Sequence, residues 1–281
     1  MSHSVKRGML GLALVIPSFL ILFVVVILPI LYAVQESLID QHSGEFGFGN
    51  YIRMFTEPAM RTNIIYTLNV TLVSTVIALL VSYALAVYLR FSKGWMARWI
   101  NRLYFIPMFV PGVIATYGLI TLYSNHGWLA RLLLLIGIDT FPKIIYSYSG
   151  LLLANLWFNI PFATMLLSSA LAAVPNSVVE SARDAGASSM QLFFRFILPL
   201  SYKTMWVALT FIFMGIIGSF TAPFLIGANS PQVLGVAMQQ VFSNYQETHT
   251  ASAMAVFMFL LCSVMGYFYI RTMGQDLDKQ A

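Results

Sequence analysis

Charged residues and cysteines are both scarce in this sequence. Only 9% of the 281 residues are charged, whereas 59% are hydrophobic. A soluble domain carries about 25% charged residues, so a soluble fold is excluded. The single cysteine, Cys262, lies in an apolar run and leaves no partner for an intrachain disulfide.

The sequence also lacks the usual marks of an enzyme. It contains no G-x-x-x-x-G-K-[ST] phosphate loop, so the chain is expected to bind no nucleotide. The four histidines are scattered, without metal-site spacing and without a paired serine or carboxylate. We therefore expect no catalytic residues, no metal and no cofactor on this chain.

The sequence does contain six apolar runs of about 20 residues or more, the length that crosses the hydrocarbon core of a bilayer. They occupy residues 10–34, 63–89, 103–123, 150–172, 204–224 and 250–270. The predicted fold is an all-α polytopic membrane protein, in which residues 1–281 form a single transmembrane domain. No run contains a charged residue. Because ion-coupled carriers usually place charges inside the membrane, the energy for any transport must be supplied elsewhere.

The basic residues indicate the orientation of these spans. If both termini are cytoplasmic, eleven lysines and arginines lie inside and four lie outside, as the positive-inside rule requires. The eleven are Lys6, Arg7, Arg90, Lys93, Arg98, Arg102, Arg183, Arg195, Lys203, Arg271 and Lys279; the four are Arg53, Arg61, Arg131 and Lys143. The net charge of +5 follows this topology, so no nucleic-acid partner is expected.

A few polar and aromatic side chains within or beside the apolar runs are candidates for a substrate path. They are Asn69, Asn155, Phe158, Asn159, Ser219, Phe220 and Thr221. Asn155 and Asn159 share one helix face, where amides either bind a neighbouring helix or contact a polar solute. Prolines are expected to bend the spans at Pro17, Pro29, Pro107, Pro111 and Pro161.

The interval 175–199 between the fourth and fifth runs carries marked helix ends. Ser177 and Glu180 have capping-box spacing, and Gly186 can take the left-handed conformation that ends a helix. A second box at Ser188 and Gln191 predicts another short amphipathic helix, which runs through Ile197 and stops at Pro199. Two short helices are thus expected on the cytoplasmic face, with small alanines that permit close docking of another protein.

This interval resembles the cytoplasmic signature of binding-protein-dependent import permeases: E-A-A, three residues, G, nine residues, I-x-L-P. Here it reads Glu180-Ser181-Ala182, Gly186, then Phe196-Ile197-Leu198-Pro199, with Ser181 and Phe196 as departures. Further resemblance lies in Gly49-Asn50-Tyr51, Asn159-Ile160-Pro161-Phe162 and Leu171-Ala172-Ala173-Val174-Pro175. By this resemblance, the residues that couple the chain to an ATPase are Glu180, Ser181, Ala182, Asp184, Ala185, Gly186, Leu198 and Pro199.

The resemblance implies a permease subunit of a type I ABC importer in the bacterial inner membrane. Its expected partners are two ATPase subunits, which bind ATP and Mg, a second permease subunit of different sequence, an extracytoplasmic substrate-binding protein and the lipid bilayer. Residues 218–227 and 234–238 are similar to the polyamine, ferric ion, thiamine and phosphonate branch of the family. A polyamine-like solute or another small organic ion is the expected substrate.

Three other functions remain open from the sequence. A sugar-type importer permease would share the fold and the coupling segment. An ATP-independent channel or secondary carrier would need no ATPase, and a membrane-embedded enzyme would need a catalytic constellation. Co-purification of an ATPase separates the first of these from the other two.

Overall fold

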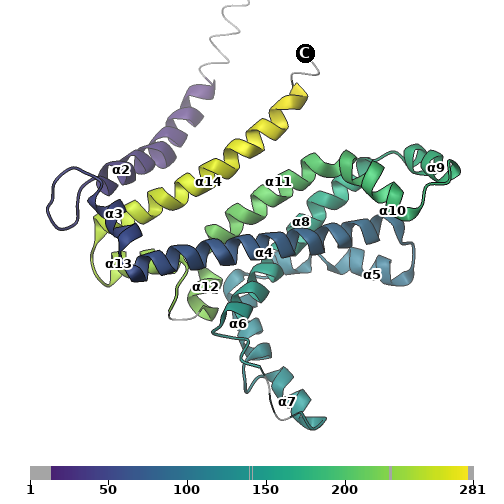
Figure 1. Cartoon of the computed structure of the whole chain (residues 1–281), viewed down its shortest axis with the longest axis horizontal. Coiled ribbons are helices and arrows are strands. Elements are labelled where there is room, and N and C mark those ends of the chain that lie inside the picture. The colour runs from purple at the N-terminus through teal and green to yellow at the C-terminus, as the bar shows by residue number, and fades with distance from the viewer. Residues whose placement is uncertain (1–13, 139, 141, 228–229, 278–281) are drawn as a thin grey trace, which may run out of the picture. The chain divides into compact units, whose positions relative to one another are not determined.

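The structure is a computed structural model, and it describes residues 14–138, 140, 142–227 and 230–277. Within these residues the only β contact is an isolated bridge between Ile39 and Phe46, and the rest is helix and loop (Figure 1). The elements are η1 (Phe23–Ile27), α2 (Leu28–Ser37), α3 (Gly49–Thr56), α4 (Pro58–Phe91), α5 (Trp95–Leu103), η2 (Ile106–Phe109), α6 (Gly112–Tyr123), α7 (Trp128–Leu135), α8 (Tyr148–Ala173), α9 (Asn176–Asp184), α10 (Ser189–Leu192), η3 (Phe193–Ile197), α11 (Leu198–Ile217), α12 (Thr221–Ile226), α13 (Leu234–Ser243) and α14 (Thr248–Leu277).

The all-helical membrane fold is confirmed. Five helices of the described chain are long and apolar enough to span a membrane, and a bent pair supplies a sixth span if its two halves are counted together. The five are Leu14–Ser37, Pro58–Phe91, Tyr148–Ala173, Ser189–Ile217 and Thr248–Thr272. The first residues of the first predicted span, with Lys6, Arg7 and Lys279, lie outside the described residues.

The third predicted span, 103–123, is broken at Pro111, one of the positions where a proline is expected to bend it. Trp95–Phe109 and Gly112–Leu135 meet at an angle of 111°. The cause is local, because Pro111 forces the preceding residue, Val110, out of the helical region, to φ −86° and ψ 122°.

The fifth predicted span, 204–224, is also displaced. The helix begins at Ser189 and ends at Ile217, and α12 is a separate short helix. Pro199 does not stop it, because the π-helical turn η3 comes directly before. In that turn the Leu198 amide bonds the Phe193 carbonyl, which opens the helix before the proline ring. The same arrangement precedes Pro29, where η1 leads into α2.

The larger of two compact units contains Thr62–Ala237 and the described residues from Leu261 onward. In it α4 packs against α8, and α8 against α11, around a cluster of small and branched side chains. The cluster contains Ala78, Ala163, Ile212 and Ile216. Ser82 on α4 donates a hydrogen bond to the Ile160 carbonyl of α8 at 3.2 Å. Small residues let these helices approach closely, which is how helices associate in a bilayer.

The smaller unit contains the described residues up to Arg61 together with Met238–Leu260. Its loop before α3 is organised by Asn50, which is fully buried and donates to the carbonyls of Ser37 and Ile39 at 3.0 and 2.7 Å. A side chain at Gly49 would collide with the carboxylate of Asp40. The amides of Ser43 and His42, helped by Arg53, lower the pKa of Asp40 to about 2. The Gly-Asn pair is therefore a structural requirement of this loop.

Candidate functional site

The start of α9 differs from the predicted capping box. Pro175 is the N-cap residue, with φ −61° and ψ 137°, and no side chain caps this end. Ser177 therefore lies inside the first turn, and the Ser177–Glu180 box does not form. The reason is that the extended backbone at Pro175 lets the helix begin at Asn176, earlier than the polar pattern indicates.

The end of α9 agrees with the prediction at Gly186. This residue has φ +82°, and its amide donates to the Arg183 carbonyl at 2.8 Å. The Ala187 amide donates to the Ala182 carbonyl at 3.0 Å, and these two bonds define a Schellman motif. The next helix begins with the predicted box, since the Gln191 amide donates to Ser188 Oγ and the Ser188 amide donates to Gln191 Oε1. The connection between α9 and α10 is thus fixed by backbone geometry on both sides of Gly186.

The two faces of α9 have different environments. Val179 and Ala182 are buried in a cluster with Leu171, Leu192 and Ile197. Ala182, predicted to belong to the docking surface, points into the protein instead, because it shares a face with Val179. The exposed predicted residues are Glu180, Ser181, Asp184, Ala185, Gly186 and Pro199, whereas Leu198 is partly buried against the same cluster. The outward face of α9 therefore presents two carboxylates four residues apart.

Arg90, at the end of α4, holds the junction between α8 and α9. Its Nε donates to the Leu171 carbonyl and its Nη2 to the Val174 carbonyl, each at 3.1 Å. The same Nη2 also donates to Asn176 Oδ1, on the first residue of α9. A guanidinium satisfies terminal carbonyls of α8 that have no helical partner, and its charge complements the negative end of the helix. From the sequence, Arg90 is only one of the basic residues that indicate the orientation of the spans. Its hydrogen-bond acceptors cannot be recognised there, because they lie more than 80 residues away in the chain.

A second contact fixes the base of the segment. The hydroxyl groups of Tyr83 and Ser201 lie 2.7 Å apart, and Ser201 also bonds the Ile197 carbonyl of η3 at 2.8 Å. The Tyr83 ring packs edge-on against Phe193. α4 therefore contacts both ends of the predicted coupling segment, at Arg90 and at Tyr83.

Of the three predicted path asparagines, Asn155 and Asn69 bond a side chain of another helix, whereas Asn159 bonds its own helix. Asn155 is 3% exposed and donates to Ser74 Oγ of α4 at 3.0 Å. Asn159 donates to the Asn155 carbonyl at 2.8 Å, and its Oδ1 lies 3.2 Å from where a Cβ on Gly215 would stand. Asn69 accepts a hydrogen bond from the Tyr148 hydroxyl at 2.6 Å. Asn159 is the partly exposed member of the pair on α8.

The other predicted path residues surround the break between α11 and α12. Ser219 and Phe220 lie in the break, and Thr221 is the first residue of α12. Ser219 Oγ bonds the Ile216 carbonyl at 2.7 Å, and Phe220 stacks on Phe224 with centroids 5.2 Å apart. Phe158 of α8 packs against the cluster that contains Ala222 and Ile226 of α12. The structure thus brings Phe158 and α12 together.

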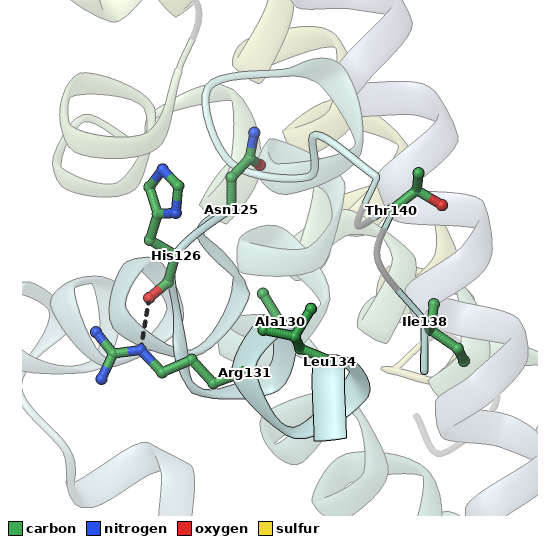
Figure 2. Close-up of a pocket in the computed structure, with 7 residues that line it drawn as sticks. All are labelled: Asn125, His126, Ala130, Arg131, Leu134, Ile138 and Thr140. Carbon is green, nitrogen blue, oxygen red and sulfur yellow. Dashed lines mark hydrogen bonds between the residues drawn. The ribbon is translucent and has the colours of Figure 1, made fainter. Parts of the chain in front are cut away.

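One recess lies apart from all of these residues. A cavity of about 710 Å³ is formed by the loop after α6 and by α7, and Figure 2 shows its lining residues. They are Asn125, His126, Ala130, Arg131, Leu134, Ile138 and Thr140. The Arg131 Nε donates to the His126 carbonyl at 3.2 Å, so that hydrogen bond is internal to the recess. None of the predicted site residues lines it.

Comparison with known proteins gives consistent matches. Residues 78–279 match the family described as binding-protein-dependent transport system inner membrane component. The spermidine/putrescine transport system permease protein PotB of Salmonella typhimurium is 26% identical over 262 residues, 91% of this chain and 90% of that protein. The thiamine transport system permease protein ThiP of Haemophilus influenzae is 27% identical over 213 residues, 75% of this chain and 39% of that protein. A crystal structure of bacterial alginate ABC transporter, in complex with alginate pentasaccharide-bound periplasmic protein, matches with a TM-score of 0.83 and 18% identity, over 95% of each chain.

Proposed function

Because this chain belongs to the family of binding-protein-dependent transport system inner membrane components, we propose that it forms half of a translocation pathway and that α9 is its coupling helix. The chain is a permease subunit of an ABC importer, a multi-pass membrane protein and not an enzyme. We place its coupling surface on the outward face of α9, where ATP-driven closure of an ATPase dimer would act.

The observation that carries this proposal is the contrast between the two faces of α9. Glu180 and Asp184 are exposed and form no ion pair among the described residues, while Val179 and Ala182 are buried. A carboxylate at the end of a firmly held helix can pair with a basic residue in a groove of another protein. The Schellman motif fixes the end of α9, and the hydrogen bonds of Arg90 connect its start to the ends of α4 and α8. A movement of α9 would therefore displace the ends of those two helices.

Co-purification tests the proposed assembly. An affinity-tagged copy of the full chain, expressed with its neighbouring transport genes and extracted in mild detergent, should bring down two copies of an ATPase. It should also bring down one permease chain of different sequence, and the binding protein should stimulate ATP hydrolysis by the complex. Recovery of the chain without any ATPase would favour an ATP-independent channel or carrier.

We propose that both termini and α9 face the cytoplasm, as the distribution of lysine and arginine favours. After Cys262 is replaced by alanine, a cysteine at the exposed position Ser189 should react with an impermeant thiol reagent only once the cytoplasmic side is opened. A cysteine at the exposed position Asn125 should react in intact spheroplasts. The reverse labelling pattern would contradict this topology.

We propose a small organic cation, such as a polyamine, as the substrate. The similarity to a spermidine/putrescine permease supports an organic cation as the substrate. The similarity to a thiamine permease also supports an organic cation, but one other than a polyamine. Because no carboxylate lies in the predicted spans, recognition would rest on aromatic faces. The partly or fully exposed aromatics Tyr117, Trp157 and Phe220 are the candidates. Mass spectrometry of the solute carried by the co-purified binding protein decides the class, and a bound sugar would indicate the sugar-type alternative.

We propose that Asn159 contacts the solute, while Asn155 mainly joins α8 to α4. Asn159→Leu should reduce transport severalfold and leave the yield of assembled complex unchanged. Asn155→Leu is the matched control on the same face, and it should lower the melting temperature of the complex, because it leaves the buried Ser74 hydroxyl without its partner. Normal transport by an assembled Asn159→Leu complex would assign that residue to helix packing as well.

A further inference from the structure

Helix α5 has three distinct faces. Trp95, Met96, Trp99 and Leu103 cover about 100° of its circumference and are 47–66% exposed. Ala97, on another face, is 4% exposed and packs onto the protein. The third face carries Arg98, Asn101 and Arg102, all exposed. We call the first and third faces together the α5 surface.

The cations of the α5 surface have no anionic partner in the described chain. No ion pair or side-chain hydrogen bond involves Arg98 or Arg102 among the described residues, and the same holds for Lys93 just before the helix. The sequence contains no aspartate or glutamate between Glu57 and Asp139. The segment that carries α5 therefore has several positive charges and nothing of opposite sign within it.

The apolar part of the α5 surface continues onto a membrane span. Trp95–Phe109 is the first half of the bent pair, which is long and apolar enough to span a membrane if its two halves are counted together. Phe105, Ile106 and Phe109, which follow α5, are also exposed apolar residues. Tryptophan is enriched where bilayer meets water, and an amphipathic helix with tryptophan on one face and arginine on the next lies in that plane.

The position of α5 in the larger unit indicates on which side of the membrane this helix lies. It begins four residues after the end of α4, and Arg90 at that end contacts the start of α9. Figure 1 places the labels of α5 and α9 near the same end of α4. α5 therefore shares the side of the membrane with the coupling segment, the side to which the basic residues assign the cytoplasm.

We propose that the α5 surface binds anionic phospholipid of the cytoplasmic leaflet, with Arg98 and Arg102 on the headgroup phosphates and Trp95 and Trp99 among the acyl chains. The lipid's phosphate supplies the negative charge that the protein lacks here, and its chains cover the four apolar side chains. This inference needs the proposed topology and does not depend on the ATPase or on the solute.

The test uses the full chain in nanodiscs of phosphatidylcholine that contain a minor fraction of phosphatidylglycerol with brominated acyl chains. Tryptophan quenching should exceed the value for random lipid mixing, and Trp95→Phe/Trp99→Phe should remove the excess. Arg98→Gln/Arg102→Gln should return quenching to random mixing, since each arginine near an anionic surface contributes on the order of fivefold in local enrichment. Arg61→Gln, an exposed arginine near the other end of α4, is the matched control and should retain the excess.

Three results would overturn the proposal. The first is equal quenching by brominated phosphatidylglycerol and brominated phosphatidylcholine when each is the minor lipid. The second is loss of the excess on addition of glycerol 3-phosphate, which would indicate a soluble phosphate site. The third is protection of Trp95 and Trp99 from brominated lipid in the assembled transporter, which would make the α5 surface a protein interface.

Discussion

Replacing Gly186 with valine is expected to abolish transport while leaving the chain inserted in the membrane. Gly186 has φ +82°, a conformation that costs an L-residue about 1–2 kcal/mol and costs a β-branched residue more. No atom lies within 4 Å of an added Cβ, so the effect comes from the backbone angle and not from a collision. Relief of that strain breaks the Schellman bonds and re-aims α10 relative to α9. ATPase retention and binding-protein-stimulated hydrolysis in the purified complex measure the result.

Two control variants separate backbone strain from the loss of glycine. Gly186→Asn should keep most of the transport, because asparagine tolerates the left-handed region better than other residues. Gly118→Ala adds a methyl group at a helical glycine that also has open space around it, and it should behave like the parent protein. Normal coupling in Gly186→Val would show that the conformation of this junction does not matter for transmission.

Glu180→Ala probes the contact and not the shape of the segment. Glu180 makes no cap in the structure, so its loss should leave the melting temperature within error of the parent. Loss of a charge partner at the proposed ATPase groove should still weaken ATPase retention by tenfold or more, on the order expected for a desolvated ion pair. Ser181→Ala, on the neighbouring exposed position, is the control and should retain the ATPase, because alanine is the residue that the family signature E-A-A has at this position. Unchanged retention in Glu180→Ala would place the docking contact elsewhere on α9.

Arg90→Ala is expected to uncouple the transporter and also to destabilise it. The substitution removes donors from the carbonyls of Leu171 and Val174 and from Asn176 Oδ1. Charge-assisted bonds of this kind contribute about 2 kcal/mol together when partly exposed to water. The melting temperature should fall, and hydrolysis should lose its response to the binding protein. Arg90→Lys should restore only part of the melting temperature and of the response to the binding protein, because an ammonium lacks the planar fork that reaches several acceptors.

The control for Arg90 lies near the other end of the same helix. Arg61→Ala removes an exposed arginine from α4 and should change neither stability nor coupling. A double-mutant cycle of Arg90→Ala with Asn176→Ala isolates the contact between α4 and α9. Additive effects in that cycle would mean that Arg90 acts through α8 alone.

The sequence predicts the helix end at Gly186 and the Ser188–Gln191 box, but it does not predict the start of α9 or the helix that continues past Pro199. Gly186 and the Ser188–Gln191 box depend on backbone geometry within five residues, which the sequence displays directly. The Ser177 box failed although its residues are adjacent, because Pro175 set the helix start first. The π-helical turn before Pro199 escaped prediction, since a proline in an amphipathic pattern indicates a stop unless packing restores the helix.

The partners of polar residues within the membrane were beyond sequence reasoning for a different reason. The sequence alone allows Asn155 either helix packing or solute contact, and its actual partner, Ser74, is 81 residues away in the chain. The sequence shows only the charge of Arg90, whereas its hydrogen-bond acceptors lie at the end of another helix. Composition and periodicity define which face of a helix is polar, and only the tertiary arrangement defines what that face meets.

Helix α4 connects two distant contact sites and has no internal break. It is a single helix of 34 residues, about 50 Å long. Near its start, Asn63 and Thr67 accept hydrogen bonds from the Gln232 and Leu234 amides at 2.9 and 2.8 Å. At its far end, Arg90 donates a hydrogen bond to Asn176, the first residue of α9. α8 contains Pro161, and the α10–α11 helix contains a π-helical turn, so each has a place to flex. α4 therefore connects these two contact sites through one unbroken helix. Any coupling free energy that it carries between binding events at its two ends is reciprocal, so each event would change the binding free energy of the other by the same amount.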